Sequence, residues 1–256
     1  MNSAYKRIKA FIISIILFFG VLFVIYCFAL GIKNICSVFE KYEAPINRVH
    51  TNEKKVSLTF DVAWGSENIE EILDILDKHN VKATFFLVGS WIDDNEELVK
   101  EIHNRGHEIG NHSNTHISFS DISNKQKLEE ITRTSKKIEN LTNEKVDLFR
   151  PPFGKVDKDT IDTCKSLGYY TIKWDVDSGD WKNIGAVNVV DRVSKNTSPG
   201  SIILFHANVR DVGTYLEDTL VNLEKKNYRM ITVSNLIYKN NYKINSSGEQ
   251  SIQEND

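Results

Sequence analysis

The sequence predicts an α/β domain built on a parallel β-sheet and preceded by one N-terminal transmembrane helix. Strand and helix patterns alternate from residue 53 to about residue 240, and residues 10–32 contain no charged side chain. The 256 residues, 41% apolar and 26% charged, suit one large globular domain or two small ones. We divide the chain into a cytoplasmic tail (1–9), a transmembrane signal anchor (10–32), a stalk (33–52), a globular domain (53–240) and a disordered tail (241–256).

The apolar segment 10–32 is long enough to cross a bilayer, which takes about 20 apolar residues in a helix. A cleaved signal peptide would have a shorter apolar core and would end in small residues, whereas this segment ends in Cys27-Phe28-Ala29-Leu30-Gly31. A buried helix of a soluble domain would normally have a polar face. We therefore expect an uncleaved signal anchor.

The charges beside this segment predict its orientation. Lys6, Arg7 and Lys9 precede it, and Lys33 is the one basic residue close after it. The positive-inside rule then places the N-terminus in the cytoplasm and the domain outside the cell membrane. The exported part is mildly acidic, which disfavours a nucleic-acid partner. Three cysteines are too few for a disulfide framework.

The two segments that flank the domain look irregular. The stalk 33–52 is mostly polar, and Pro45 would break a helix. Residues 241–256 contain almost no apolar side chains and are predicted to be disordered.

Between these segments, residues 56–60 alternate apolar and small polar side chains, as a strand does, and apolar residues over 69–76 lie at helical spacing. The alternation continues with expected helices at 98–102, 128–141, 161–167, 187–193 and 215–226, and expected strands at 83–88, 107–109, 169–174, 201–205 and 230–233. Repeated strand-then-helix units predict a parallel sheet, either open or closed into a barrel.

Titratable side chains follow several of these strands. In parallel α/β folds the chemistry is found where the strands end. We therefore expect these residues to meet at one edge of the sheet: Asp61, His112, His116, Arg150, Asp175, Asp177, Asp180, Trp181 and His206.

His112 and His116 are four residues apart in a polar loop. Two imidazoles at this spacing can share a metal such as Zn²⁺, although two surface histidines would give the same pattern. Asp61 directly follows a buried strand, so it is a helix cap, a structural ion pair or a functional carboxylate. Near a metal-bound water it would act as a general base, and Arg150 would keep it ionised.

Residues 150–154, Arg-Pro-Pro-Phe-Gly, form a rigid loop because two prolines fix the backbone. A rigid loop also suits an oxyanion site, with the N–H of Phe153 as donor.

His206 ends the most apolar strand, where a lone histidine is usually a hydrogen-bonded core or rim residue. A carboxylate from segment 177–181 would raise its pKa and make it a competent general acid, although this segment also reads as a loop with Asx turns. Trp181 and Trp64 offer an aromatic wall for a sugar, or ordinary packing.

Together and in this order, the motifs resemble the polysaccharide deacetylase family, also called NodB-homology domains or carbohydrate esterase family four. The resemblance covers about residues 54–238 and implies a distorted, incomplete (β/α) barrel. It rests on Thr59-Phe60-Asp61, His112-Ser113-Asn114-Thr115-His116, Arg150-Pro151-Pro152-Phe153-Gly154, Asp177-Ser178-Gly179-Asp180-Trp181 and Leu204-Phe205-His206.

The resemblance implies a role for each matching residue and a divalent metal, Zn or alternatively Co or Mn. These roles are Asp61 as base, His112 and His116 as metal ligands, Arg150 as orienter of the base, Phe153 as oxyanion donor, His206 as acid, Asp180 as the residue that tunes this acid, and Trp181, Leu204 and Trp64 as the groove.

One residue departs from the family pattern. The family has a second aspartate, which binds the metal, where this sequence has Val62. Catalytic zinc normally has three protein ligands. Three outcomes are open: Asp61 itself binds the metal, Glu67 or a water substitutes, or the metal site is weak or lost. The form Asp61-Val62-Ala63-Trp64-Gly65 resembles a membrane-anchored branch linked to sporulation.

We therefore expect a membrane-anchored N-deacetylase of a cell-wall glycan, with peptidoglycan as substrate. The class would be hydrolases that act on carbon–nitrogen bonds other than peptide bonds. Val62 favours a rival hypothesis, a catalytically weak glycan-binding or scaffolding protein on the same fold. A third hypothesis is a metal hydrolase for a small acyl amide or ester.

Overall fold

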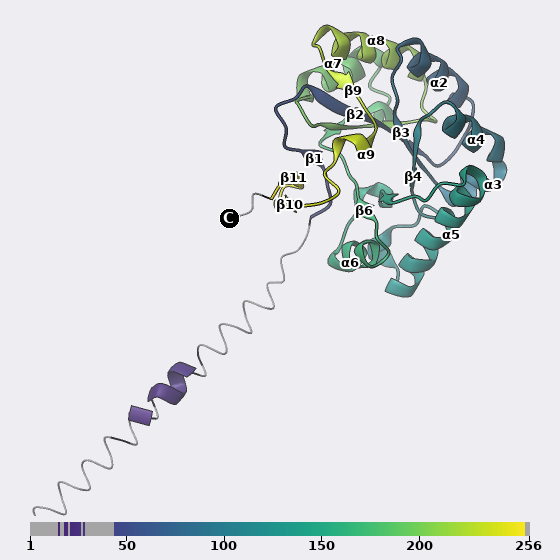
Figure 1. Cartoon of the computed structure of the whole chain (residues 1–256). Coiled ribbons are helices and arrows are strands. Elements are labelled where there is room, and N and C mark those ends of the chain that lie inside the picture. Colours follow the sequence, from purple (N-terminus) through teal and green to yellow (C-terminus); the bar gives the residue numbers. More distant parts are fainter. Residues whose placement is uncertain (1–14, 16–17, 20, 27, 29–43, 254–256) are drawn as a thin grey trace, which may run out of the picture. The chain divides into compact units, whose positions relative to one another are not determined.

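Figure 1 shows the computed structural model, which describes residues 15, 18–19, 21–26, 28 and 44–253. The chain divides into two compact units, residues 1–42 and 43–256. The described residues between 15 and 28 are helical, and their side chains are exposed. Within the described part, no helix is both long and apolar enough to cross a membrane. The predicted tail 1–9 and most of the predicted anchor 10–32 and stalk 33–52 lie outside the described residues.

The second unit is built on a parallel β-sheet with the strand order β6-β5-β4-β3-β2-β8-β7, and β9 pairs with the start of β2. Among the described residues β6 and β7 end this path without pairing to each other, so the predicted incomplete (β/α) barrel is confirmed (Figure 1). The strands are β2 (Lys55–Val62), β3 (Thr84–Leu87), β4 (Glu108–Asn111), β5 (Leu148–Phe149), β6 (Tyr170–Thr171), β7 (Val176–Asp177), β8 (Ile202–His206) and β9 (Arg229–Met230).

The helices cover this sheet with their apolar faces. The predicted helix at 69–76 is part of α2, whose Ile69, Ile72, Leu73 and Leu76 are buried as the spacing requires. The short α3 escaped prediction because its six residues are fewer than two turns. The helices are α2 (Ile69–Lys78), α3 (Gly89–Asp94), α4 (Glu96–Asn104), α5 (Asn124–Thr142), α6 (Lys158–Ser166), α7 (Ala186–Asn196), α8 (Val212–Lys225) and α9 (Val233–Leu236).

A stack of aromatic rings lies at the centre of the core. The Phe60 ring of β2 stacks on Phe85 of β3 at a centroid distance of 5.0 Å and on Phe205 of β8 at 5.6 Å. Such a pair adds about 0.5–1.5 kcal/mol beyond the apolar area that it buries. Phe60 directly precedes Asp61 and Phe205 directly precedes His206, so the stack also fixes the strand ends that carry these two groups.

Residues 241–256 are not a disordered tail over their described part, and this prediction was wrong. A second sheet joins β1 (Arg48–Val49), β11 (Glu249–Ile252) and β10 (Tyr242–Ile244) in the order β1-β11-β10. Gln250 of β11 is fully buried, and its side chain bonds both the N–H and the carbonyl of Tyr238. Backbone pairing and one buried side-chain amide hold this segment in place, so its low apolar content did not mean that it is disordered.

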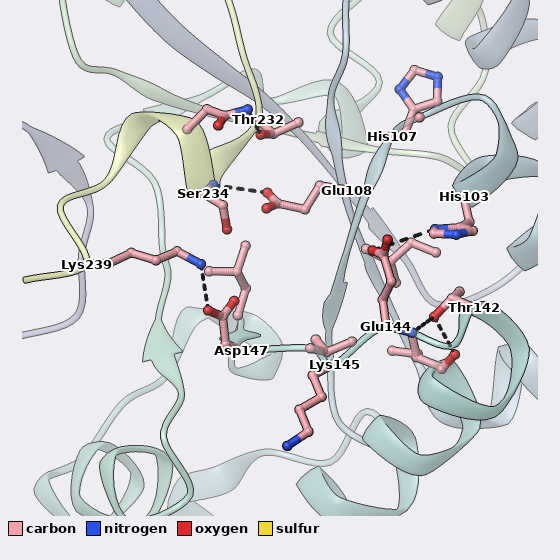
Figure 2. Close-up of a pocket in the computed structure, with 16 residues that line it drawn as sticks. His103, His107, Glu108, Thr142, Glu144, Lys145, Asp147, Thr232, Ser234 and Lys239 are labelled. Atoms are coloured by element: carbon pink, nitrogen blue, oxygen red, sulfur yellow. Dashed lines mark hydrogen bonds and ion pairs between the residues drawn. The ribbon is translucent and has the colours of Figure 1, made fainter.

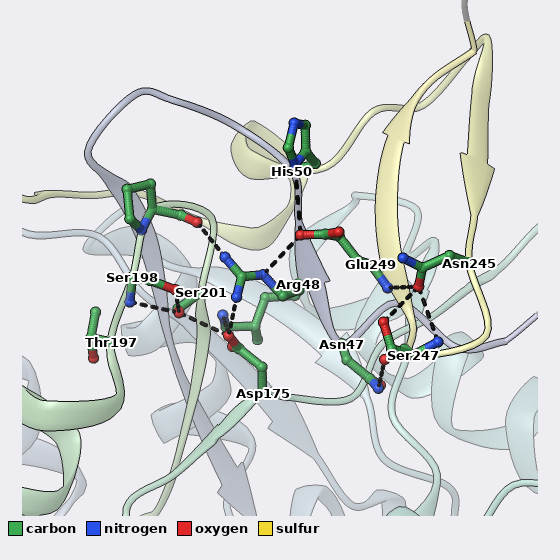
Figure 3. A network of polar contacts seen from close by, with 12 residues as sticks. Asn47, Arg48, His50, Asp175, Thr197, Ser198, Ser201, Asn245, Ser247 and Glu249 are labelled. Atoms are coloured by element: carbon green, nitrogen blue, oxygen red, sulfur yellow. Dashed lines mark hydrogen bonds and ion pairs between the residues drawn. The ribbon is translucent and has the colours of Figure 1, made fainter.

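The same sheet takes up the end of the predicted stalk, since β1 lies within residues 33–52. Figure 3 shows how Arg48 joins this strand to its surroundings. Its Nη2 donates to the carbonyl of Pro199 at 2.8 Å, and its Nε lies 3.4 Å from Glu249 Oε1. Arg48 Nη1 lies 3.7 Å from Asp175 Oδ2. The compact unit therefore begins near residue 43, before the predicted boundary at 53.

Candidate active site

A pocket of about 520 Å³ opens at the carboxyl ends of the sheet strands. Two predicted residues, Arg150 and Asp180, lie outside its wall but hydrogen-bond to Asp61 and His206, which belong to the wall. Apart from Asp175, the structure therefore brings together all the side chains that the sequence predicted for the site. The wall consists of Asp61, Ala63, Trp64, His112, His116, Phe153, Trp174, Asp177, Trp181, Leu204, His206 and Asn208.

Asp61 is held on one side of the pocket by the fully buried Arg150. Arg150 Nη1 donates to Asp61 Oδ1 and to Thr59 Oγ1, both at 2.8 Å, and Nη2 donates to the carbonyl of Lys173 at 2.9 Å. Burial opposes the charged form of Asp61, but electrostatic attraction to the neighbouring His112 and Arg150 side chains outweighs it and lowers the pKa of this carboxyl. Asp61 is therefore a carboxylate at neutral pH.

His112 lies beside the second oxygen of Asp61. Its Nδ1–H donates to the carbonyl of Arg150 at 2.7 Å, which directs Nε2 toward Asp61 Oδ2, 3.4 Å away. Burial lowers the pKa of His112, so the imidazole is neutral at neutral pH. The Nε2 atom then carries a lone pair, as a base or a metal ligand requires.

His206 and Asp180 form a second pair beside Asp61, because Asp61 of β2 and His206 of β8 are register partners on adjacent strands. Asp180 Oδ1 accepts from His206 Nδ1 at 2.9 Å, and Asp180 Oδ2 accepts from the backbone N–H of His206 at 2.7 Å. Burial works against the imidazolium, but the hydrogen bond and the negative charge of Asp180 outweigh it and raise the pKa of His206. The pair therefore favours a protonated imidazole, in contrast to His112.

The loop that carries both candidate metal ligands is held by neighbouring side chains. Glu130 of α5 accepts from the N–H groups of Asn114 and Thr115, both at 2.8 Å. Ser113 Oγ accepts from the N–H of His116, which itself has a left-handed φ of 56°. A non-glycine residue in this region is strained, and such strain persists where surrounding bonds fix it.

Exposed aromatic rings surround the opening. Trp64, Phe153 and Trp181 expose 59%, 62% and 53% of their surfaces. The His116 ring lies edge-on between Trp64 and Phe153, at centroid distances of 4.8 and 4.7 Å, and its burial lowers the pKa of His116 to about 4. Since prolines have no N–H, the first N–H after Arg150 in this loop belongs to Phe153, whose φ is 59°.

Comparison with known proteins identifies this arrangement. The sequence profile of the polysaccharide deacetylase family matches residues 48–172. A peptidoglycan-N-acetylglucosamine deacetylase of Bacillus cereus is 36% identical over 74% of this chain and 91% of its own length. The peptidoglycan-N-acetylmuramic acid deacetylase PdaA of Bacillus subtilis is 32% identical over 84% of this chain and 82% of its own length. The chain belongs to the polysaccharide deacetylase family.

Two further matches place this family member among related proteins. The protein YlxY of Bacillus subtilis is 35% identical over 75% of this chain, which spans 60% of the length of YlxY. A solved structure of a CE4 family pseudoenzyme from Bacillus anthracis has a TM-score of 0.73 and 37% identity, over 75% of this chain and 68% of its own. The predicted enzyme class, hydrolases of non-peptide carbon–nitrogen bonds, is confirmed by the two deacetylase relatives.

Deacetylases of this family generally depend on a metal, so the question is which side chains of this chain could bind one. His112 and His116 supply two imidazoles, but Val62 is fully buried in the apolar core and does not line the pocket. Glu67 turns back to its own loop, where Oε2 accepts from the N–H of Ser66. Among the described residues no group of three or more His, Cys, Asp or Glu side chains is placed to hold a metal ion. These residues therefore do not fit the three-ligand site of a catalytic zinc.

Sequence reasoning missed several residues at the site. Trp174, Ala63 and Asn208 line the pocket, and the Trp174 ring lies 5.5 Å from the guanidinium of Arg150. Trp174 is the last residue of the predicted strand 169–174, and this position already indicated that it lies at the same edge of the sheet. Asp175, by contrast, was expected at this edge but binds the backbone N–H of Ile202 at 2.8 Å, where β8 begins. It stabilises the sheet at the other end of β8.

A second pocket, of about 460 Å³, lies at the amino ends of β4 and β5. Figure 2 shows two of its polar pairs: Lys239 lies 2.7 Å from Asp147, and His103 Nδ1 lies 4.0 Å from Glu144. Glu108 Oε2 accepts from Thr84 Oγ1 at 2.7 Å and from the N–H of Ser234 at 3.2 Å. The sequence predicted no site here.

Proposed function

We propose that this chain is a membrane-anchored N-deacetylase that removes acetyl groups from amino sugars of cell-wall peptidoglycan. The observation that carries the proposal is the presence of two charged pairs at one pocket, Asp61 with Arg150 and His206 with Asp180. The two deacetylases of peptidoglycan among the relatives support this substrate. One of these relatives acts on N-acetylglucosamine and the other on N-acetylmuramic acid, so the assay must determine which sugar this chain deacetylates.

Asp61 acts as the base in this proposal. Arg150 occupies its Oδ1 and keeps it ionised, so Oδ2 is the oxygen that takes the proton from the attacking water. The water attacks the acetyl carbonyl, and negative charge develops on the carbonyl oxygen. The N–H of Phe153, in the loop that Pro151 and Pro152 stiffen, is the donor proposed for that oxygen.

His206 acts as the acid. The carbon–nitrogen bond breaks only if the leaving amine gains a proton, since an amide anion is a very poor leaving group. Asp180 raises the pKa of His206, so a larger fraction of this imidazole is protonated near neutral pH than of an ordinary histidine. Donation to the nitrogen gives acetate and a free amino sugar.

The exposed rings of Trp64, Phe153 and Trp181 are proposed to bind the sugar chain. Flat aromatic faces suit the apolar faces of pyranose rings, and these three rings belong to the wall of the pocket. The apolar segment 10–32 would hold this domain at the outer face of the cell membrane, next to its polymer.

A second candidate is a glycan-binding protein with little or no turnover. The observation that favours it is Val62, a buried apolar side chain at the position of the family's metal-binding carboxylate. The related pseudoenzyme shows that this fold also occurs without activity. The preserved Asp61, Arg150, Asp180 and His206 favour the first candidate, because binding alone needs neither a base nor an acid.

The test is acetate release from purified peptidoglycan by the full chain, compared with Asp61→Asn and His206→Gln. We expect each variant to lose about 100-fold or more in kcat, since a positioned base or acid contributes about 10²–10⁴-fold. Asp147→Asn and His103→Gln, the same changes in the second pocket, serve as controls and should keep full activity. Acetate release only after Val62→Asp would support the binding protein instead. Accessibility of the domain to protease on intact protoplasts tests the predicted orientation.

A further inference from the structure

The carboxylate of Asp180 receives four hydrogen bonds, and one of them comes from outside the acid pair and its loop. Oδ1 accepts from Trp181 N–H at 2.8 Å and from His206 Nδ1. Oδ2 accepts from His206 N–H and from the hydroxyl of Tyr215 at 3.2 Å. The Tyr215 hydroxyl belongs to the first turn of α8, which follows β8 in the chain.

The tyrosine ring is fixed in this position. Tyr215 is 2% exposed, and its ring stacks on Phe205 at a centroid distance of 6.0 Å and an angle of 12°. Phe205 in turn belongs to the central aromatic stack and directly precedes His206. One ring contact therefore ties the Tyr215 hydroxyl to the same strand as the acid that Asp180 holds.

We propose that Tyr215 is a positioning residue of the acid pair, whose hydroxyl holds the Asp180 carboxylate and weakens its pull on the proton of His206. The inference rests on the proposed function for its catalytic consequence, but not for its geometry. A carboxylate that already accepts a hydrogen bond from a hydroxyl is a weaker acceptor for the imidazole. A general acid must release its proton, so a histidine held too strongly is a poorer acid.

Tyr215 contacts the Asp180 carboxylate from outside the candidate active site. Tyr215 and Asp180 line a polar pocket of about 580 Å³, and neither belongs to the wall of the candidate active site. Removing the hydroxyl should therefore change kcat and leave KM unchanged. The charged and titratable groups around His206, Asp180 and Tyr215 are Asp61, Asp177, His112, His116, Arg210 and Asp211.

The experiment is a titration of the histidine side chains by NMR in the full chain with ¹³C-labelled histidine, with the His206 signal assigned through His206→Gln. Tyr215→Phe keeps the ring and removes only the hydroxyl. We expect the apparent pKa of His206 to rise by roughly half a unit, the direction expected when a carboxylate loses a competing donor. We also expect kcat for acetate release to fall about threefold at neutral pH, with KM unchanged. Tyr228→Phe, which removes a hydroxyl that bonds the carbonyl of Thr197, is the matched control and should change neither.

A double-variant comparison separates positioning from general packing. In an Asp180→Asn background, Tyr215→Phe should have no further effect on the pKa of His206 or on kcat, because the hydroxyl acts through the carboxylate. Equal effects in both backgrounds, or an unchanged His206 pKa in Tyr215→Phe, would overturn the inference. If the unmodified chain releases no acetate, the proposed function fails, but the titration still tests the role of Tyr215.

Discussion

Strands β4 and β5 bear polar groups at both ends, and the two ends hold these groups very differently. At the carboxyl ends, His112 and Arg150 are buried, His112 donates to the carbonyl of Arg150, and Arg150 donates to Asp61. At the amino ends, the side chains of Asp147 and Lys239 are each 41% exposed, and that of Glu144 is 74% exposed. The two pockets are similar in volume and both contain acids and bases.

The two ends differ in how much stability is lost when one partner of an ion pair is removed. An exposed ion pair contributes about 0–1 kcal/mol, because water replaces the missing partner. A buried group has no such replacement, so its ionisation is set by the protein. At the carboxyl end the pKa of His112 is lowered and that of His206 is raised, whereas at the amino end burial lowers the pKa of His107 to about 4 without a partner that opposes it as Asp180 does for His206. Titratable side chains that are buried and bonded to one another therefore distinguish the candidate active site from the second pocket, whose ion pairs are exposed.

The largest expected effect is that of Arg150→Met. The variant leaves Asp61 buried without its cation, which should lower the free energy of unfolding by about 3–5 kcal/mol. Lys239→Met beside Asp147 is the matched change at the other end and should cost about 1 kcal/mol or less. Urea unfolding of the full chain measures both. Similar losses in the two variants would mean that the two pockets do not differ as described.

The same variant has a pH signature. The folded-state pKa of Asp61 is lowered, so its contribution to stability is present above the unfolded value of about 3.9 and is lost as pH falls through the folded value. The difference between the unmodified chain and Arg150→Met should therefore shrink below about pH 4. A difference that stays constant down to pH 2 would assign the loss to packing of the arginine rather than to its charge.

A smaller effect is expected from Asp180→Asn. Without the carboxylate the pKa of His206 falls, so the imidazole loses its proton at lower pH and the basic limb of the rate profile moves down in pH. We expect kcat at pH 8 to fall about tenfold or more. The folded-state pKa of His206 is raised, so its stabilising contribution is full below the unfolded value of about 6.5 and is lost as pH rises through the folded value.

Glu144→Gln, next to His103 in the second pocket, is the control for this prediction. His103 is partly exposed, and its carboxylate partner lies 4.0 Å away, so the rate profile should not change. If the basic limb of the pH–rate profile does not shift in Asp180→Asn, His206 is not the acid.

The site was largely predictable because its main residues lie at the carboxyl ends of strands or in the loops that follow them. Asp61 is the next-to-last residue of β2 and His206 is the last residue of β8, and the apolar runs before them are plain in the sequence. The sequence could not predict Tyr215, which lies 35 residues after Asp180 on a helix face that reads as ordinary core. Its hydroxyl gains a partner only when α8 packs on β8.

The C-terminal strands were missed for a similar reason. Gln250 is polar and lies in a polar segment, yet it is fully buried because its amide satisfies the backbone of Tyr238. Hydrophobic patterns report burial of apolar groups and do not report burial that hydrogen bonds make possible. The pairing of β11 with β1 joins residues about 200 positions apart, which no local pattern contains.

The smallest expected effect concerns bound metal, and it extends the comparison between the two pockets. Neither pocket provides three suitable ligands among the described residues, so both should lack tightly bound zinc. We expect the full chain, purified and dialysed without chelator, to contain well below one zinc per chain by elemental analysis, and His116→Ala to contain the same. A full equivalent of zinc that survives dialysis and is lost in His116→Ala would contradict this. It would mean that His112 and His116 recruit a third ligand, and the carboxyl-end pocket would then differ from the other in metal binding as well as in burial.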